Sequence, residues 1–267
     1  MAVYTGKVVV ITGASSGIGR ALCLALAEQR PRLVLAARDR AALDAVAEGC
    51  AAKGADTLVV PTDVSSPEAC QALIEKTIDR FKALDVLVNN AGIGMIARLD
   101  ETKDLSVYEH LMKVNYLGCV YPTYHALPHL KKSRGQIVAM ASLAGLTGVP
   151  TRTGYAASKH ALFGFFDSLR IELAGTGVSV TMIAPYFVRS EIHRRSAGPD
   201  GQPLGTSSMQ ESKIMTAEEC AALTVRAMER RQRQLVMTLK GKVGRFVRLL
   251  APGVVDAIAR RAVATGK

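Results

Sequence analysis

The chain has 267 residues, 49% of them hydrophobic and none of them tryptophan, and a formal net charge of +11. This length is enough for one large α/β domain or two small ones with a full hydrophobic core. The five cysteines are odd in number, widely spaced and without a C-x-x-C pair, which favours a reduced, intracellular protein and gives no metal site. No signal peptide is visible, and no apolar run approaches the roughly 18 residues of a transmembrane helix.

Short β-branched apolar runs alternate along the chain with longer stretches rich in alanine and leucine. Strands are predicted at residues 7–12, 32–37, 57–61, 84–89, 135–141, 178–184 and 234–238. Helices are predicted at 17–29, 40–53, 67–81, 107–131, 153–174 and 217–232. This alternation predicts a single Rossmann-type, doubly wound parallel sheet of about seven strands flanked by helices, over residues 1–240. Its ligand crevice should lie at the carboxyl ends of the strands.

A glycine-rich loop follows the first strand and opens the first helix, reading T-G-A-S-S-G-I-G-R over residues 12–20. Glycines allow a tight turn and close approach to a pyrophosphate, which then sits on the positive helix N-terminus. The spacing G-x-x-x-G-x-G differs from G-x-G-x-x-G, and a plain β–α turn is the alternative. The position after the first strand favours a nucleotide site. Its candidate residues are Gly13, Ser15, Ser16, Gly17, Ile18 and Gly19.

The end of the second predicted strand bears on which nucleotide is bound. An acidic residue there would bind a ribose 2′-hydroxyl and repel a 2′-phosphate. This chain has Ala37 followed by Arg38, whose guanidinium suits a phosphate, so NADP(H) is favoured over NAD(H). The alternative is that Arg38 pairs with Asp39 or caps the next helix. Asp63, next to Val64 after the third strand, is a candidate acceptor for the adenine amino group.

Tyr155 and Lys159 are four residues apart in a predicted helix, and Ser142 lies thirteen residues upstream of Tyr155. Positions i and i+4 share a helix face, so the phenol and the ammonium lie side by side. A phenol alone is a poor proton shuttle near neutral pH, and a cation one turn away favours its phenolate form. Because this spacing is also common on ordinary helix surfaces, the surrounding motifs decide its meaning.

Together these motifs resemble the classical short-chain dehydrogenases/reductases over about residues 5–240. The matching motifs are the glycine loop, Asn89-Asn90-Ala91-Gly92, Asn115, Ser142 and Tyr155-x-x-x-Lys159. The resemblance implies hydride transfer to or from a nicotinamide nucleotide, interconverting a carbonyl and a secondary alcohol. It also implies that Asn90, Ala91 and Gly92 line the adenosine ribose.

The resemblance assigns roles to four side chains. Tyr155 is the general acid/base, and Ser142 hydrogen-bonds the same substrate oxygen. Lys159 binds the nicotinamide ribose and favours ionisation of Tyr155. Asn115 holds a water that links Lys159 to solvent as a proton relay.

One segment departs from the family pattern. The family usually has P-G-x-V-x-T after the sixth strand, whereas residues 185–190 read P-Y-F-V-R-S. In this segment, which begins at Pro185, Val188 can still donate its backbone N–H to the carboxamide, and Ser190 retains a hydroxyl. Tyr186 and Phe187 add bulk, so a narrower or more apolar mouth of the site is expected. The following loop, 189–213, is rich in glycine, proline and serine, and we interpret it as a substrate lid rather than an inert loop.

Most of the positive charge lies near the carboxyl end. Residues 226–267 hold eleven Lys/Arg against two Asp/Glu, a net +9 of the chain's +11. Within the extension 241–267, a helical wheel separates an apolar from a basic side. The apolar residues are Val243, Phe246, Val247 and Leu250, and the basic ones are Lys242, Arg245 and Arg248. Packing on the domain or on a second subunit is favoured, and peripheral membrane contact is the alternative. Nucleic-acid binding is not expected.

The sequence therefore predicts an NADP(H)-dependent oxidoreductase acting on a small, partly apolar carbonyl or alcohol. The alternatives are an NAD(H)-dependent alcohol or hydroxysteroid-type dehydrogenase and a non-catalytic nucleotide-binding protein. The second is disfavoured because the tyrosine, lysine and serine are all present. A cytoplasmic homodimer or homotetramer is expected, paired through the helices at 107–131 and 153–174.

Overall fold

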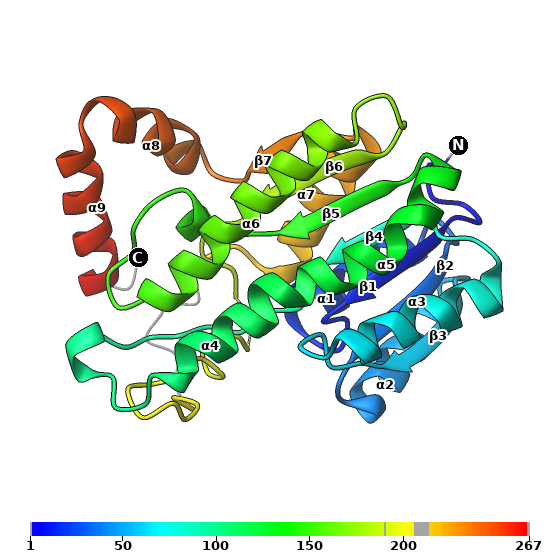
Figure 1. Ribbon diagram of the computed structural model, residues 1–267, viewed down its shortest axis with the longest axis horizontal. Coiled ribbons are helices and arrows are strands. Elements are labelled where there is room, and N and C mark those ends of the chain that lie inside the picture. Colours follow the sequence, from blue (N-terminus) through cyan, green and yellow to red (C-terminus); the bar gives the residue numbers. More distant parts are fainter. Residues whose placement is uncertain (1, 190, 206–213, 266–267) are drawn as a thin grey trace.

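The computed structural model describes residues 2–189, 191–205 and 214–265, the side chains of 264 and 265 excepted. Its centre is a seven-stranded sheet in the order β3-β2-β1-β4-β5-β6-β7, and every neighbouring pair is parallel (Figure 1). The strands are β1 (Val8–Thr12), β2 (Arg32–Ala37), β3 (Asp56–Pro61), β4 (Val86–Asn89), β5 (Gln136–Met140), β6 (Ser179–Ala184) and β7 (Gln234–Val236). The predicted doubly wound parallel sheet is confirmed.

The strand order reverses next to β1. The chain runs outward from β1 to β3 and then crosses over to β4, on the other side of β1. At this switch point the chain continues from β1 and from β4 to helices on opposite faces of the sheet, which creates a crevice at the carboxyl edge.

Helices cover both faces of the sheet. One face is packed by α1 (Gly17–Ala27), α2 (Arg40–Ala51) and α7 (Ala217–Glu229), and the other by α3 (Pro67–Phe81), α5 (Gly118–Ser133) and α6 (Thr153–Glu172). Strand residues alternate between the faces: Val9 and Ile11 belong to the first core cluster, and Val8 and Val10 to the second. Because both faces are buried, the strands read as continuous apolar runs.

The helix starts fall into two kinds. Side-chain caps begin α2, where Asp39 accepts from the backbone of Ala42, and α3, where Ser66 has the same role. Helix α7 has a full capping box formed by Thr216 and Glu219. Ser16, at the start of α1, makes no such bond. The first-turn N–H groups of α1 therefore have no side-chain acceptor, as an anion site requires.

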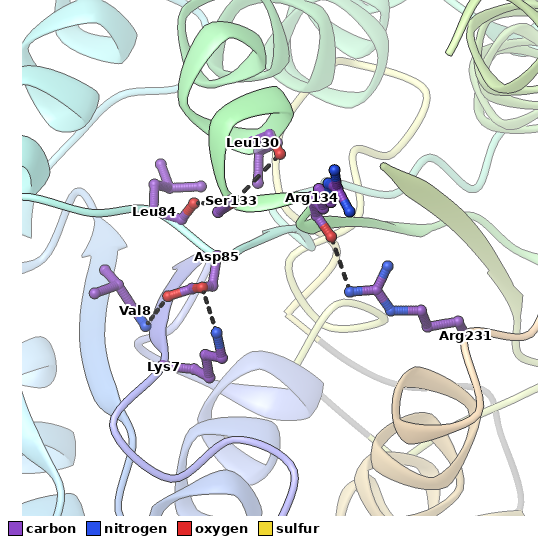
Figure 2. Close-up of polar contacts among 8 residues, drawn as sticks. All are labelled: Lys7, Val8, Leu84, Asp85, Leu130, Ser133, Arg134 and Arg231. Atoms are coloured by element: carbon purple, nitrogen blue, oxygen red, sulfur yellow. Dashed lines mark hydrogen bonds and ion pairs between the residues drawn. The ribbon is translucent and has the colours of Figure 1, made fainter. Parts of the chain in front are cut away.

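Polar contacts join the strands and helices at the amino edge of the sheet (Figure 2). Asp85, just before β4, accepts 2.9 Å bonds from the backbone N–H of Val8 and from the Lys7 ammonium. At the end of α5, Ser133 donates to the Leu84 carbonyl at 2.8 Å. These contacts fix where β1 and β4 begin.

The predicted single helix at 107–131 is wrong in one respect. The structure has α4 (Ser106–Met112), a π-helical turn at Lys113–Leu117, and then α5. The apolar pattern runs through this break, so periodicity does not reveal it. Inside α5, Pro122 lacks the N–H that a regular helix would donate to the Gly118 carbonyl. Single π turns are frequent at functional sites, and this one carries Asn115.

The basic extension forms two helices. They are α8 (Leu239–Leu250), capped by Thr238, and α9 (Pro252–Thr265), and they pack on each other at the end of the molecule to which β5 points (Figure 1). Pro252 ends the first helix but begins the second, because the first position of a helix needs no N–H donor. None of the described helices is long and apolar enough to cross a bilayer.

Candidate active site

A cavity of about 1550 Å³ occupies the carboxyl edge of the sheet. Its walls come from the loops after the strands, the starts of α1 and α6, and the pair α8–α9. The predicted site residues that line it are Gly13, Ser15, Ser16, Gly17, Ile18, Gly19, Arg38, Asp63, Val64, Asn90, Ala91, Gly92, Ser142, Tyr155, Lys159, Pro185 and Val188. Asn115 lies behind the wall, and Ser190 is outside the described residues.

The glycine loop after β1 is held against the loop after β4. Asn90 donates its side-chain amide to the backbone carbonyls of Thr12 and Gly13, at 2.9 and 3.2 Å. A Cβ on Gly13 would lie 2.8 Å from Cα of Ala91, and one on Gly19 would lie 2.1 Å from the Gly13 carbonyl. Gly13 also has a positive φ of 66°. Only glycine fits these two positions, and the bare backbone beside the uncapped start of α1 suits a diphosphate.

Arg38 lies exposed at the end of β2 and lines the cavity. The alternative of pairing with Asp39 is not observed, since Asp39 accepts from the backbone N–H of Ala42 at 3.0 Å. Across the crevice, the Asp63 carboxylate accepts from the backbone and hydroxyl of Ser65 at 2.9 and 2.7 Å. Burial raises the pKa of Asp63, but the Ser65 bonds and the Arg38 charge outweigh it and lower the pKa.

Tyr155 and Lys159 share one face of α6, as the spacing predicts. The Lys159 ammonium is almost fully buried, 5.7 Å from the centre of the Tyr155 ring, and donates to the Met140 carbonyl at 2.9 Å. Ser142, two residues beyond Met140, lines the same part of the cavity and accepts from the Ala144 N–H at 3.2 Å. A hydroxyl, a phenol and an ammonium therefore meet at one end of the cavity.

Asn115 braces this arrangement from behind. Its side chain exchanges bonds with the backbone of Ile93, accepting at 2.8 Å and donating at 3.0 Å. It also donates to the Ser158 hydroxyl of α6 at 2.9 Å. A Cβ on Gly92 would lie 3.2 Å from the Asn115 oxygen and 3.6 Å from the Lys159 ammonium, so the loop after β4 passes close to both.

The segment after β6 gives the cavity an aromatic wall. Tyr186 and Phe187 are half-buried with ring centres 4.5 Å apart, and burial raises the pKa of Tyr186. Arg152, one turn before Tyr155, places its guanidinium carbon 5.5 Å from the centre of the Phe187 ring. Sequence reasoning missed Arg152, although its position three residues before Tyr155 places it near the same helix face.

Two further segments complete the cavity. In the predicted lid, Ala197 forms backbone bonds with Gly94 and Ile96 at 3.0 and 2.9 Å, which holds residues 191–205 beside the loop after β4. The pair α8–α9 supplies the apolar residues Val243, Val247, Val254 and Ile258. The apolar side of α8 thus has two destinations, because Val247 faces the cavity while Phe246 and Leu250 remain exposed.

Comparisons with known sequences identify the family of this chain. Residues 7–199 match the family model described as short chain dehydrogenase. The chain is 37% identical over 261 residues to 11-beta-hydroxysteroid dehydrogenase A of Sesamum indicum, covering 96% of this chain and 75% of that protein.

Two solved structures have the same fold. A short chain dehydrogenase/reductase from Burkholderia phymatum, in complex with NAD, is 29% identical with a TM-score of 0.84, over 95% of this chain and 96% of that one. The alcohol dehydrogenase of the archaeon Thermococcus sibiricus, complexed with 5-hydroxy-NADP, is 27% identical with a TM-score of 0.74, over 86% and 94%. This chain therefore belongs to the short-chain dehydrogenase/reductase family, oxidoreductases that bind a nicotinamide cofactor.

Proposed function

We propose that the protein is an NADP(H)-dependent oxidoreductase that interconverts a carbonyl and a secondary alcohol, with Tyr155 as general acid/base. The observation that carries this proposal is one continuous cavity. It joins the glycine loop at one end to Ser142, Tyr155 and Lys159 at the other. A dinucleotide and a small substrate can therefore meet at the phenol.

When bound, the nicotinamide nucleotide supplies or accepts the hydride. Tyr155 gives its proton to the carbonyl oxygen in reduction and takes it back in oxidation, and Ser142 donates a hydrogen bond to the same oxygen. Lys159, whose charge lies beside the phenol, holds the nucleotide ribose. The Asn115 side chain already forms hydrogen bonds with Ile93 and Ser158. We therefore expect the proposed water of the proton relay to bind the main-chain carbonyl of Asn115.

Arg38 supports the choice of NADP(H). It lines the cavity beside the second strand end and forms no ion pair within the described ranges, so its guanidinium can receive a 2′-phosphate. NAD(H) remains the alternative because the solved relatives carry NAD in one case and an NADP derivative in the other. By family resemblance, Pro185, Val188 and Ser190 would hold the carboxamide.

Apolar walls support a partly apolar substrate. The aromatic pair after β6 and the valine and isoleucine side chains of α8–α9 line the part of the cavity beyond Tyr155. The Sesamum indicum relative is named for a hydroxysteroid. A lipid or steroid carbonyl is therefore the first class to test here.

The test is turnover of a panel of apolar ketones and aldehydes with NADPH and with NADH. Tyr155→Phe should lower kcat on any active substrate by roughly 10²- to 10⁴-fold, the usual contribution of a general acid/base, while NADPH binding measured by fluorescence stays intact. Tyr4→Phe, which removes a hydroxyl that donates to Gln136 outside the cavity, is the matched control. Turnover that survives Tyr155→Phe contradicts the mechanism, and nucleotide binding without turnover of any carbonyl supports the non-catalytic alternative.

We also propose that α8–α9 attaches the protein to anionic membrane surfaces. Three exposed large apolar side chains of this pair, Phe246, Leu249 and Leu250, do not line the cavity and are available to a membrane. Six basic side chains accompany them, against Asp256 alone. Binding to vesicles that contain phosphatidylserine, weakened by salt and by Leu250→Asp, is expected, because each basic residue contributes about 1 kcal/mol near such a surface. The alternative is that α8–α9 contacts a second subunit. It is favoured if the protein does not bind these vesicles at low salt, or if Leu250→Asp dissociates a dimer.

A homodimer or homotetramer formed through α5 and α6 is proposed on the exposed apolar Tyr124 and Ile171 of these helices. Light scattering of the wild type and of Ile171→Asp tests it, and a monomeric wild type would contradict it. The five cysteines are all free and buried, which supports a reducing compartment, and we propose the cytoplasm.

A further inference from the structure

Arg152 is a cation of the cavity wall that the proposed chemistry does not use. It immediately precedes α6 and is partly buried, with its guanidinium carbon 5.5 Å from the centre of the Phe187 ring. Burial lowers the pKa of Arg152, with the neighbouring Tyr155 acting in the opposite direction. Removing a charge from water is costly, so arginines in such places normally have an anionic partner.

No such partner is found in the part of the chain that the structure describes. The Arg152 guanidinium forms neither an ion pair nor a hydrogen bond with the described residues. Its neighbours are the Phe187 ring and the Tyr155 side chain. Other partly buried arginines do have polar partners. Arg170 pairs with Asp167, and Arg245 donates to Gln234.

The surroundings of Arg152 add positive potential rather than reduce it. The residue occupies the start of α6, where the helix dipole disfavours a cation, and it makes no side-chain cap there. Lys159 is a further cation of the cavity lining, and its ammonium donates to the uncharged Met140 carbonyl. An anion entering this part of the cavity is therefore stabilised.

The geometry separates this anion from the phosphates of the nucleotide. Lys159 contacts the end of β5 through the Met140 carbonyl, and Tyr155 lies one helical turn before it in α6. Arg152 is about 10 Å from Lys159 along the helix axis, at a rise of 1.5 Å per residue. The glycine loop and Arg38 lie at the ends of β1 and β2. Arg152 thus faces the substrate side of Tyr155.

We propose that Arg152 binds a carboxylate of the substrate, so that the enzyme acts on apolar oxo acids and the corresponding hydroxy acids. The planar guanidinium matches both oxygens of a carboxylate, and the Phe187 ring lies beside it in the cavity wall. Because Arg152 and Tyr155 are within one turn of each other, the carboxylate lies a few bonds from the carbonyl. The apolar remainder of the substrate contacts the valine and isoleucine side chains of α8–α9.

This inference rests on the proposed carbonyl reduction. In that two-electron reduction the carbonyl carbon gains a hydride, supplied by the nicotinamide nucleotide, and the oxygen gains the Tyr155 proton. The carboxylate is neither formed nor consumed. Arg152 is therefore a specificity-determining residue that binds a group the reaction leaves unchanged.

The first experiment compares 3-, 4- and 5-oxodecanoate with their methyl esters, using NADPH. The wild type should prefer at least one acid by about tenfold or more in kcat/KM, and Arg152→Gln should remove that preference while changing ester turnover little. Arg152→Lys, which keeps the charge but loses the planar fork, should recover part of it. Arg194→Gln removes an exposed arginine nearby that does not line the cavity, and should leave the preference intact.

The second experiment measures binding without turnover. Calorimetry with the NADPH-loaded protein should show octanoate binding that weakens about tenfold or more in Arg152→Gln, with octanol unaffected. If octanoate binding depends on Arg152 but the protein reduces no carbonyl, the proposed function is refuted and the anion site is supported.

Three results would overturn the proposal. The wild type could reduce every ester with the same kcat/KM as the corresponding acid. Octanoate could bind the wild type and Arg152→Gln equally. Arg152→Gln could instead lower acid and ester turnover by the same factor, with a shifted pH profile, in which case Arg152 only positions Tyr155.

Discussion

The two edges of the same parallel sheet are built in opposite ways. At the amino edge, polar groups pair with each other: Asp85 joins β1 to β4, and Arg231 donates to the Arg134 carbonyl at 2.9 Å (Figure 2). Arg231 also donates to the Gly177 carbonyl, at 3.1 Å. At the carboxyl edge, α1 begins without a side-chain cap, and neither Arg38 nor Arg152 forms an ion pair with a described residue. One edge stabilises the fold, whereas the other leaves polar groups for ligands to satisfy.

The largest expected effect comes from filling the carboxyl edge. Gly19→Ala places a Cβ 2.1 Å from the Gly13 carbonyl, so the loop must move. We expect NADPH affinity to fall on the order of 100-fold, because overpacking of this kind costs about 1–3 kcal/mol or more. Fluorescence titration measures it.

Gly164→Ala in α6 is the matched control, since a Cβ there meets nothing within 4 Å. It should raise stability by about 0.5–1 kcal/mol and leave NADPH affinity unchanged. If Gly19→Ala binds NADPH as the wild type does, the glycine loop is not the cofactor cradle.

An intermediate effect is expected at the end of β2. Arg38→Asp should weaken NADPH binding by about 10- to 100-fold and NADH binding much less, because it replaces a charge-assisted contact to the 2′-phosphate by repulsion. Arg40→Asp makes the same change at an arginine that pairs with Asp44 and does not line the cavity, and serves as the control. An unchanged preference between the two nucleotides in Arg38→Asp would refute the NADP(H) assignment.

The smallest effect is expected at the amino edge and should concern stability alone. Asp85→Ala leaves the Val8 N–H without its acceptor and should lower the free energy of unfolding by about 1–2 kcal/mol in urea. NADPH affinity should not change. Lys7→Met removes only the half-exposed ion pair and should cost less than about 1 kcal/mol. A loss of NADPH affinity in Asp85→Ala would show that the two edges are not independent.

Much of the fold and part of the site could be predicted from the sequence. The strands are continuous apolar runs because both their faces are buried, and the glycines and the Tyr155–Lys159 pair follow local spacing rules. The π turn was hidden because one extra residue in a helix leaves the apolar pattern almost unchanged. The sequence does not reveal Arg152 as a site residue. Its role is inferred from the lack of an anionic partner among the described residues, which only the three-dimensional structure shows.

The sequence does not predict that the pair α8–α9 lines the cavity, because amphipathicity does not say what an apolar helix face covers. Charge and periodicity separated its basic and apolar sides correctly. They did not show that Val247 on α8 and Ile258 on α9 line the cavity, which depends on how the two helices fold back beyond β7.

That wall has a consequence for the response to heat. Helices α8 and α9 contact mainly each other and β7, and much of their apolar surface is exposed, whereas the glycine loop is fixed to the central strands. Elements with few buried contacts open at lower free energy than the core. On gentle warming the enzyme should therefore lose its hold on apolar substrates while it still binds the nucleotide, and amide exchange in α8–α9 should accelerate well before exchange in β1 or β4.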